Sequence, residues 1–168
     1  MSPFESSDAV VAGNVLAYGA TSGEVFARGV VGERCAVRNS GAVVVTEGVG
    51  DHCCEYMTGG RVVVLGEIGR NFGAGMSGGI AYVHDPLDVL ARRCNLDTIE
   101  LERLDLDDDE WLSSIVTRFA AETGSVLAAQ LASSWRDARS SFVAIVPLGW
   151  RDATAPIEPT GHLVGAHA

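Results

Sequence analysis

The sequence contains no lysine, because all twelve of its basic residues are arginine. That absence excludes a P-loop lysine, a Schiff-base lysine and a catalytic serine–lysine pair. Nothing in the chain approaches the roughly 18 consecutive apolar residues of a membrane-spanning helix. Residues 1–11 also lack the basic start and the apolar stretch of a signal peptide. We therefore expect a cytoplasmic chain with no membrane partner.

Positive charge is scarce as well: 12 basic residues face 22 acidic ones, for a net charge of −10. This balance argues against a nucleic-acid partner. Eight of the acids lie between Asp97 and Glu110, so part of the charge is a local feature. Cysteine is also rare, and its pattern does not match the framework of a small secreted disulfide protein. We expect reduced thiols at Cys35, Cys53, Cys54 and Cys94.

Glycine, in contrast, is abundant, and its spacing is regular. A first register recurs at intervals of 18, 19 and 19 residues, and a second follows it nine residues later each time. Short runs rich in β-branched residues separate the glycines, which predicts strands joined by tight turns. A unit of this length is too short for a strand plus a helix and fits one coil of a parallel β-helix. The two registers are Gly23, Gly41, Gly60, Gly79 and Gly32, Gly50, Gly69.

The aligned repeats predict which residues stack in neighbouring coils. One apolar column contains Val25, Val43, Val62 and Ala81, and an earlier column contains Leu16, Cys35, Cys53 and Phe72. Such columns would fill the core of a β-helix. Glycine suits its corners, where φ is positive or backbones come close. We interpret ten glycines as structural corners: Gly23, Gly32, Gly41, Gly50, Gly60, Gly69, Gly73, Gly75, Gly78 and Gly79.

The C-terminal third follows a helical period instead. Asp107–Asp109 would provide the N-cap of a first helix, which Gly124 would end, and Ser125 would cap a second helix that runs to about Trp135. Phe142–Pro147 predicts a short strand or an extended docking segment. The apolar face of the first helix would contain Trp111, Leu112, Ile115, Val116 and Phe119.

These patterns predict an all-β core, a parallel β-helix with glycine corners, followed by a short α-helical appendage. Residues 1–12 form a lead-in that pairs with the first coil, and residues 13–94 form the β-helix. Residues 95–150 contain an acidic linker, two helices and the docking segment. Residues 151–168, rich in Pro, Gly, Thr and Ala, form a disordered tail.

One stretch, NFGAGMSGG from Asn71 to Gly79, has the G-x-G-x-x-G spacing of a dinucleotide-binding loop. Such a loop must close a strand and open a helix, so that the helix N-terminus meets the pyrophosphate. Here another strand, Ile80–Val83, follows the glycines. Asp97 has the spacing of the ribose-binding acid but lies in a polar loop. We interpret these glycines as a corner of the repeat.

No other group of residues indicates chemistry. The run Asp51–Cys54 combines metal ligands, but adjacent cysteines rarely chelate one ion, and Cys53 falls in an apolar column. His84 falls in a mixed column that indicates a surface or rim position, and with Asp85 it ends the last coil. We therefore predict no catalytic, cofactor-binding or metal-binding residue in this chain.

Six blocks together resemble a known family: AVRNSGA, EGVGDH, EYMTGG, VVVLG, NFGAGMSGG and AYVHD. They are similar to the GXGXG domain that closes the large subunit of glutamate synthase, over residues 13–85 and more weakly to residue 150. The resemblance implies a right-handed β-helix that braces other domains. It implies that those domains, not this one, hydrolyse glutamine at an N-terminal cysteine and form glutamate with FMN and an iron–sulfur cluster. The glutaminase and FMN-binding synthase domains are the implied partners.

Two further hypotheses stay open. One is a scaffold subunit of a related amidotransferase-type oxidoreductase, such as N-methylglutamate synthase, and gene neighbours would distinguish it. The other is a stand-alone β-helix enzyme acting on polysaccharides, which needs a groove of stacked acids or arginines. The repeat offers only the scattered Arg38, Glu47, Glu55 and Glu67. Exposed apolar surface is the expected signature of a partner, and through it an isolated chain would self-associate.

Overall fold

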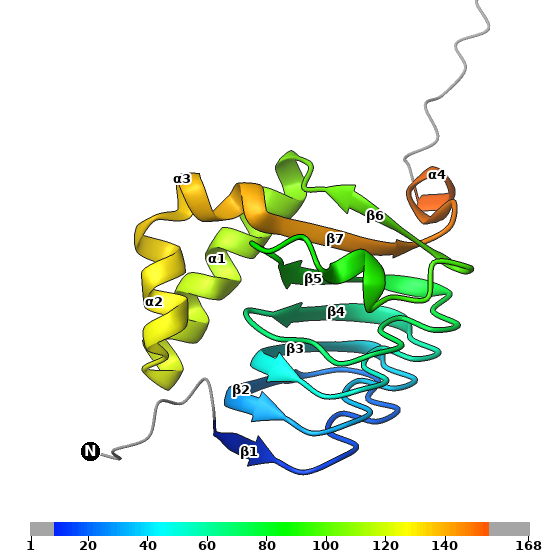
Figure 1. Cartoon of the computed structure of the whole chain (residues 1–168), viewed down its shortest axis with the longest axis horizontal. Coiled ribbons are helices and arrows are strands. Elements are labelled where there is room, and N and C mark those ends of the chain that lie inside the picture. The colour runs from blue at the N-terminus through cyan, green and yellow to red at the C-terminus, as the bar shows by residue number, and fades with distance from the viewer. Residues whose placement is uncertain (1–8, 155–168) are drawn as a thin grey trace, which may run out of the picture.

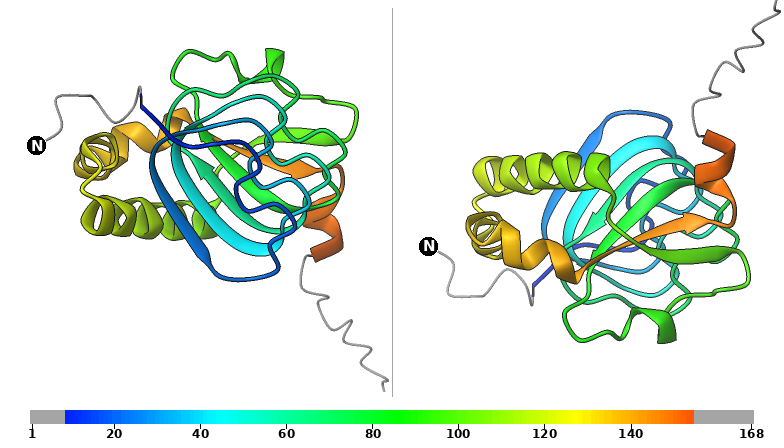
Figure 2. Two further views of the ribbon diagram at one scale, coloured as in Figure 1. Left: turned by 90° about the horizontal axis from the view of Figure 1, so that it is seen from below. Right: turned by 90° about the horizontal axis from the view of Figure 1, so that it is seen from above.

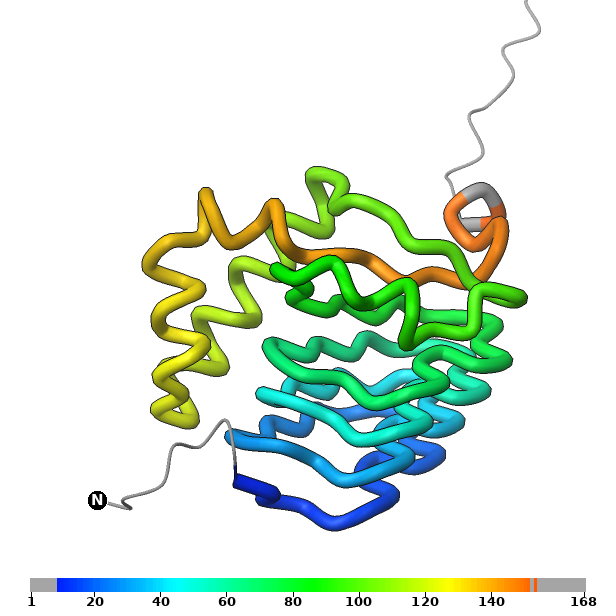
Figure 3. Tube along the Cα trace, in the orientation of Figure 1, coloured from blue at the N-terminus to red at the C-terminus, as the bar shows by residue number. Residues whose placement is uncertain are grey.

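A computed structural model describes residues 9–154 of the chain (Figure 1). Seven strands form one sheet in the order β1-β2-β3-β4-β5-β7-β6, and the first five run parallel. Each parallel strand is one side of a coil, and Figure 3 shows the coils stacked on one another. The predicted β-helical core is thus confirmed. Its strands are β1 (Val10–Ala12), β2 (Glu24–Val31), β3 (Ser40–Val49), β4 (Thr58–Val64) and β5 (Gly78–His84).

Strand pairing corrects the predicted register by one residue in one coil. Val44, and not Val43, lies between Val25 and Val62 in the apolar column. The pairing of β3 with β4 shifts between Ser40 and Val43, so β3 carries an extra residue there. A bulge of this kind is absorbed within one strand. Glycine spacing alone therefore could not place the second coil correctly.

The opposite side of each coil is a run of turns in which every second residue is left-handed. The backbone N–H groups of most of these residues donate across coils, for example Cys54 to the Cys35 carbonyl and Tyr56 to the Ala74 carbonyl, each at 2.9 Å. A left-handed residue other than glycine costs about 1–2 kcal/mol, and the hydrogen bonds between coils offset that strain. The left-handed residues are Val15, Ala17, Gly19, Arg34, Ala36, Arg38, His52, Cys54, Tyr56, Asn71, Gly73 and Gly75.

Two antiparallel strands extend the sheet beyond β5. β7 (Phe142–Pro147) pairs with β5, and β6 (Ile99–Arg103) pairs with β7. β7 confirms the predicted strand. β6 lies in the segment expected to be an acidic linker, although its sequence IELER alternates apolar and charged residues as a half-buried strand does.

The helices pack on the outer face of the sheet, as both views of Figure 2 show. The N-cap of α1 is Asp105, which forms a reciprocal capping box with Asp108; Asp107–Asp109 thus lie in the first turn and do not include the cap. Gly124 ends α1 with a φ of 69° and Ser125 caps α2, both as predicted. The helices are α1 (Leu106–Thr123), α2 (Val126–Ser133), α3 (Trp135–Ala138) and α4 (Trp150–Thr154), with the 3-10 turns η2 (Leu90–Arg92) and η3 (Arg139–Ser141).

α4 corrects the expectation of a disordered tail from residue 151. Arg151 in this helix forms ion pairs with Glu102, Asp105 and Asp108. These partners are more than forty residues away in the sequence, which is why local composition gave no sign of them. The rest of the predicted tail, residues 155–168, lies outside the described residues, as do residues 1–8 of the lead-in. Of that lead-in, β1 pairs with the first full strand, β2.

Alternation along the strands divides the apolar residues between two cores. Val44 and Val62 face the interior of the coils, where Phe72 and the buried cysteines also pack. Their neighbours Val45 and Val63 face outward and pack under α1 and α2. A period of two is what sends adjacent residues to opposite faces of a strand. None of the helices of residues 9–154 is long and apolar enough to cross a membrane.

Four exposed apolar side chains lie on β1 and the first coil, at the end of the stack opposite β6 and β7. They are Val10, Val11, Val15 and Tyr18, between 44% and 71% exposed. Self-association through such a surface stays a prediction.

Candidate functional site

The first two glycines of the G-x-G-x-x-G string, Gly73 and Gly75, lie in the turn run that precedes β5. Gly73 and Gly75 have φ values of 70° and 66°. The string leads into strand β5, which begins at Gly78. A Cβ at Gly75 would meet the ring of Tyr56 at 2.6 Å, and one at Gly73 would meet Ile99 at 3.1 Å. The space beside these glycines is therefore occupied by side chains of the protein itself.

The other predicted corner glycines lie where coils approach closely. At Gly69, for example, a Cβ would lie 2.3 Å from the backbone nitrogen of Asp51 in the preceding coil. Gly23 differs, because the space around it is open and only its φ of 92° favours glycine. A Cβ would meet a backbone atom of another coil at 3.0 Å or less at Gly32, Gly41, Gly50, Gly60, Gly69, Gly78 and Gly79.

The Asp51–Cys54 run does not converge on a metal site. Asp51 forms an ion pair with Arg70, whose backbone N–H and side chain lower the pKa of that carboxyl. His52 bonds to Glu55 through Nδ1 at 2.7 Å, while Cys53 and Cys54 are fully buried. Within residues 9–154, no cluster of three or more His, Cys, Asp or Glu side chains could hold a metal ion.

A buried polar network joins the helical appendage to the β-helix. The Tyr82 hydroxyl donates to Asp108 at 2.7 Å, and the Asp108 side chain, which is only 3% exposed, also forms an ion pair with Arg151. Burial, together with Asp108, raises the pKa of Tyr82. The side chain of Trp111 packs on Tyr82, and Arg61 lies 4.3 Å from the centre of the Trp111 ring. The network ties β5, α1 and α4 together.

A second polar contact joins the appendage to β3. Glu47 is only 2% exposed, and its Oε1 accepts a hydrogen bond from the Ser125 hydroxyl at the start of α2. The same hydroxyl accepts from the Ala128 backbone N–H at 3.0 Å. The other carboxylate oxygen of Glu47 has no hydrogen-bond partner among the described residues. No local pattern indicates this link, because Ser125 and Glu47 lie 78 residues apart in the sequence.

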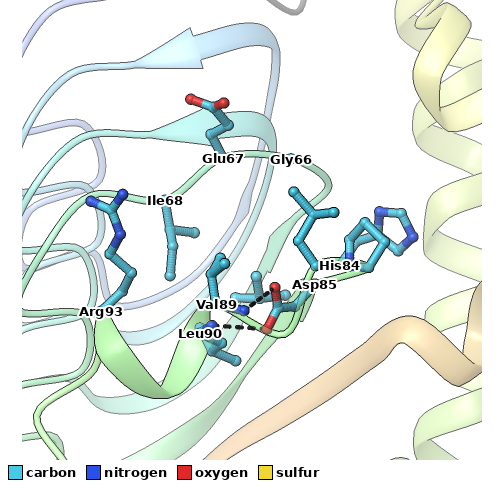
Figure 4. A pocket seen from close by; sticks show the side chains of 11 residues that line it. Gly66, Glu67, Ile68, His84, Asp85, Val89, Leu90 and Arg93 are labelled. Atoms are coloured by element: carbon cyan, nitrogen blue, oxygen red, sulfur yellow. Dashed lines mark hydrogen bonds between the residues drawn. The ribbon is translucent and has the colours of Figure 1, made fainter.

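A hollow of about 330 Å3 lies between the Gly66–Ile68 segment and the residues at the end of β5 and just after it. Figure 4 shows the side chains that line it. Asp85 closes one side by accepting hydrogen bonds from the Val89 and Leu90 backbone N–H groups, at 3.0 and 2.9 Å. His84 is among the residues that line the hollow, and burial lowers the pKa of its imidazole. The walls are mainly apolar, and Figure 4 shows the Glu67 carboxylate directed away from Asp85.

A second hollow, of about 540 Å3, shares the Gly66–Ile68 segment with the first. It contains two of the four charged residues that the repeat offered for a groove, Glu47 and Glu67. Arg38 and Glu55 lie in the turn runs instead, where the Arg38 N–H donates to the Glu55 carbonyl. The residues that line this second hollow are Val30, Glu47, Val49, Gly66, Glu67, Ile68, Gly69 and Leu127.

Comparison with known proteins gives one family. The profile described as "GXGXG motif" matches residues 1–148. The chain is 49% identical over 155 residues to the glutamate synthase (NADPH) large chain of Bacillus subtilis, covering 91% of this chain and 10% of that protein. It is 48% identical to glutamate synthase (NADH) of Schizosaccharomyces pombe (88% and 7%) and 46% identical to ferredoxin-dependent glutamate synthase of Pyropia yezoensis (86% and 9%). The chain thus spans a tenth or less of the length of these relatives.

Proposed function

This chain belongs to the GXGXG-motif family, and from that premise we propose that it is a non-catalytic structural domain of a glutamate synthase. In this role the β-helix braces the domains that hydrolyse glutamine and those that form glutamate with FMN and an iron–sulfur cluster. One observation carries the proposal: about nine-tenths of the chain aligns with glutamate synthases of three different electron donors. A domain common to all three is suited to a task independent of the donor.

The architecture supports a bracing role. Hydrogen bonds between coils run along both the strands and the turn runs, so each coil is fixed to the next on two sides. Glycines let the backbones come close at the corners, and the networks around Tyr82 and Glu47 attach the helices to the sheet. A body held together in this way resists bending, which is what a spacer between catalytic domains requires.

The most deeply buried polar groups of the chain take part in contacts within the chain itself. The buried carboxylates of Asp108 and Glu47 bind Tyr82 and Ser125, and the cysteine column packs in the core. The chemistry of the enzyme would then come from the rest of the polypeptide, which makes up nine-tenths or more of the relatives.

Purification from the native host tests the proposal. We expect this chain to co-purify in a fixed ratio with polypeptide that contains a glutaminase domain and an FMN-binding synthase domain, identified by mass spectrometry. The substrates of the recovered assembly then distinguish glutamate synthase from N-methylglutamate synthase. Recovery of the chain with no synthase domain contradicts a bracing role.

A further inference from the structure

The Glu47 carboxylate is a buried charged group with half of its hydrogen-bonding capacity unused. Glu47 is only 2% exposed, and its Oε1 accepts a hydrogen bond from the Ser125 hydroxyl. Oε2 finds no donor among the described residues. A buried carboxylate without a cationic partner costs free energy, because it has lost its water and gained little in return. The contact with Ser125 accounts for Oε1, whereas nothing in the described residues accounts for the buried Oε2.

The surroundings of Glu47 suit a positive charge. Glu47 and Glu67 are the two ionisable residues that line the second hollow, and no arginine is part of the lining. Two residues before Ser125, the Thr123 carbonyl accepts a hydrogen bond from Arg28 at 3.4 Å. That guanidinium forms no ion pair with Glu47 within residues 9–154.

The walls of the hollow indicate which kind of side chain would bring a positive charge to Glu47. Val30, Val49, Ile68 and Leu127 supply apolar surface around the two carboxylates. A long basic side chain has this combination of an apolar stem and a charged head. Arginine fits better than lysine, since its guanidinium has five donors in one plane and can bind a carboxylate through two of them.

We propose that the hollow lined by Glu47 and Glu67 receives an arginine side chain from the adjoining polypeptide of the same enzyme. The proposal rests on the proposed function, since it takes the partner to be one of the domains that this chain braces. The relatives contain nine-tenths or more of their length outside the aligned region, so such a polypeptide exists in them. Glu47 then recognises a partner, while its link to Ser125 positions α2 beside the hollow.

A titration of the 15N-labelled chain with N-acetyl-L-arginine amide tests the site. We expect saturable shifts of the amide signals of Gly48, Gly66 and Glu67, and much smaller shifts with the uncharged analogue N-acetyl-L-citrulline amide. N-acetyl-L-lysine amide should bind more weakly than the arginine probe. Equal responses to the arginine and citrulline probes, or no saturable shift at these residues, would overturn the proposal.

Two variants with the same change of charge locate the effect. Glu47→Gln should abolish the arginine-specific shifts, whereas Glu110→Gln, at an exposed position on α1, should leave them unchanged. If Glu47→Gln does not fold, Glu67→Gln carries the same comparison, with an expected loss of several-fold in affinity. Arginine-specific shifts that persist in Glu47→Gln, or in Glu67→Gln where that variant replaces it, would contradict the assignment.

Thermal unfolding separates recognition from a purely structural role. In the absence of any probe, Glu47→Gln should unfold at a higher temperature than the wild type, because it removes an unpaired buried charge and keeps an acceptor for Ser125. The arginine probe should raise the midpoint of the wild type only. A lower midpoint for Glu47→Gln would show that the carboxylate is needed by the fold itself. All these measurements use this chain alone, so they can fail or succeed independently of the partner test above.

Discussion

The ring of Tyr56 lies against the backbone of Gly75 in the next coil, where a Cβ would be only 2.6 Å from the ring atom Cδ1. Both residues are left-handed, with φ values of 54° and 66°, and the Tyr56 N–H donates to the carbonyl of Ala74. The second glycine of the G-x-G-x-x-G string thus makes room for a side chain of the preceding coil. The space beside Gly75 is thus occupied by an aromatic ring of the chain itself.

Gly75→Ala is therefore expected to lower the free energy of unfolding by about 1–3 kcal/mol, from its left-handed φ and from the contact with Tyr56. When Tyr56 is also replaced by alanine, Gly75→Ala should lower the free energy of unfolding only through its left-handed φ, by about 1–2 kcal/mol at most. Urea unfolding followed by circular dichroism measures both. Gly13→Ala is the control, since nothing lies within 4 Å of its Cβ position and its φ is not positive. Identical costs in the two backgrounds would refute the steric explanation.

Tyr82→Phe removes the hydroxyl that donates to the buried Asp108. We expect a loss of about 1–2 kcal/mol, because the carboxylate keeps Arg151 and its capping contact but loses a buried donor. Tyr18→Phe, at a side chain 50% exposed, should change stability by less than about 0.5 kcal/mol. Chemical denaturation curves give both values. If the two variants lost equal stability, the network would not be what holds the appendage.

His84 should make stability depend on pH. Burial holds the pKa of its imidazole below the usual value, although the Leu65 backbone and Asp85 act in the opposite direction. Below about pH 6.5 the unfolded chain then binds more protons at His84 than the folded chain does, so stability falls as pH falls. The NMR titration midpoint of the His84 ring should lie below that of the unfolded chain. A midpoint at or above the unfolded value contradicts this prediction.

The thiols should be inert in the folded chain. Cys35, Cys53 and Cys54 have no exposed surface, and burial raises the pKa of the partly exposed Cys94 to about 12. The pKa of Cys35 is raised by its hydrogen bond with Cys53 and by burial, and that of Cys53 by burial. A disulfide reagent near neutral pH should label the native chain slowly, with Cys94 first, and all four thiols once the chain is unfolded. Rapid labelling of Cys53 in the folded chain would contradict the prediction that the buried thiols are inert.

The core and most of the helical appendage could be predicted because their signals are local or periodic. Glycine spacing and β-branched runs predicted the coils, and Gly124 and Ser125 predicted where one helix ends and the next begins. The bulge in β3 was invisible, because an extra residue in one strand leaves the glycine pattern nearly unchanged. For β6 the alternating IELER signal was present but was outweighed by the acidic composition of its surroundings.

The candidate site could be predicted only in part. Glu47 and Glu67 are 20 residues apart, close to one repeat, so the period could have placed them on adjacent coils. Glu67 is exposed, whereas the burial of Glu47 depends on α2, whose first residues lie far along the chain and contact Glu47 through Ser125. The ion pairs of Arg151 also join distant parts of the sequence, since they connect the short helix α4 to acidic residues more than forty positions earlier. Such tertiary contacts leave no mark in local sequence.

Glutamine-dependent glutamate formation, measured with and without this chain, tests the central claim most directly. The glutaminase and FMN-binding domains from the same organism would be expressed with and without the chain, and the chain would also be purified alone. The account predicts that the chain alone shows no stoichiometric flavin absorbance and no glutaminase activity, and that the other domains need it for coupled glutamate formation. Full coupled activity without the chain, or stoichiometric flavin on the isolated chain, would contradict the account.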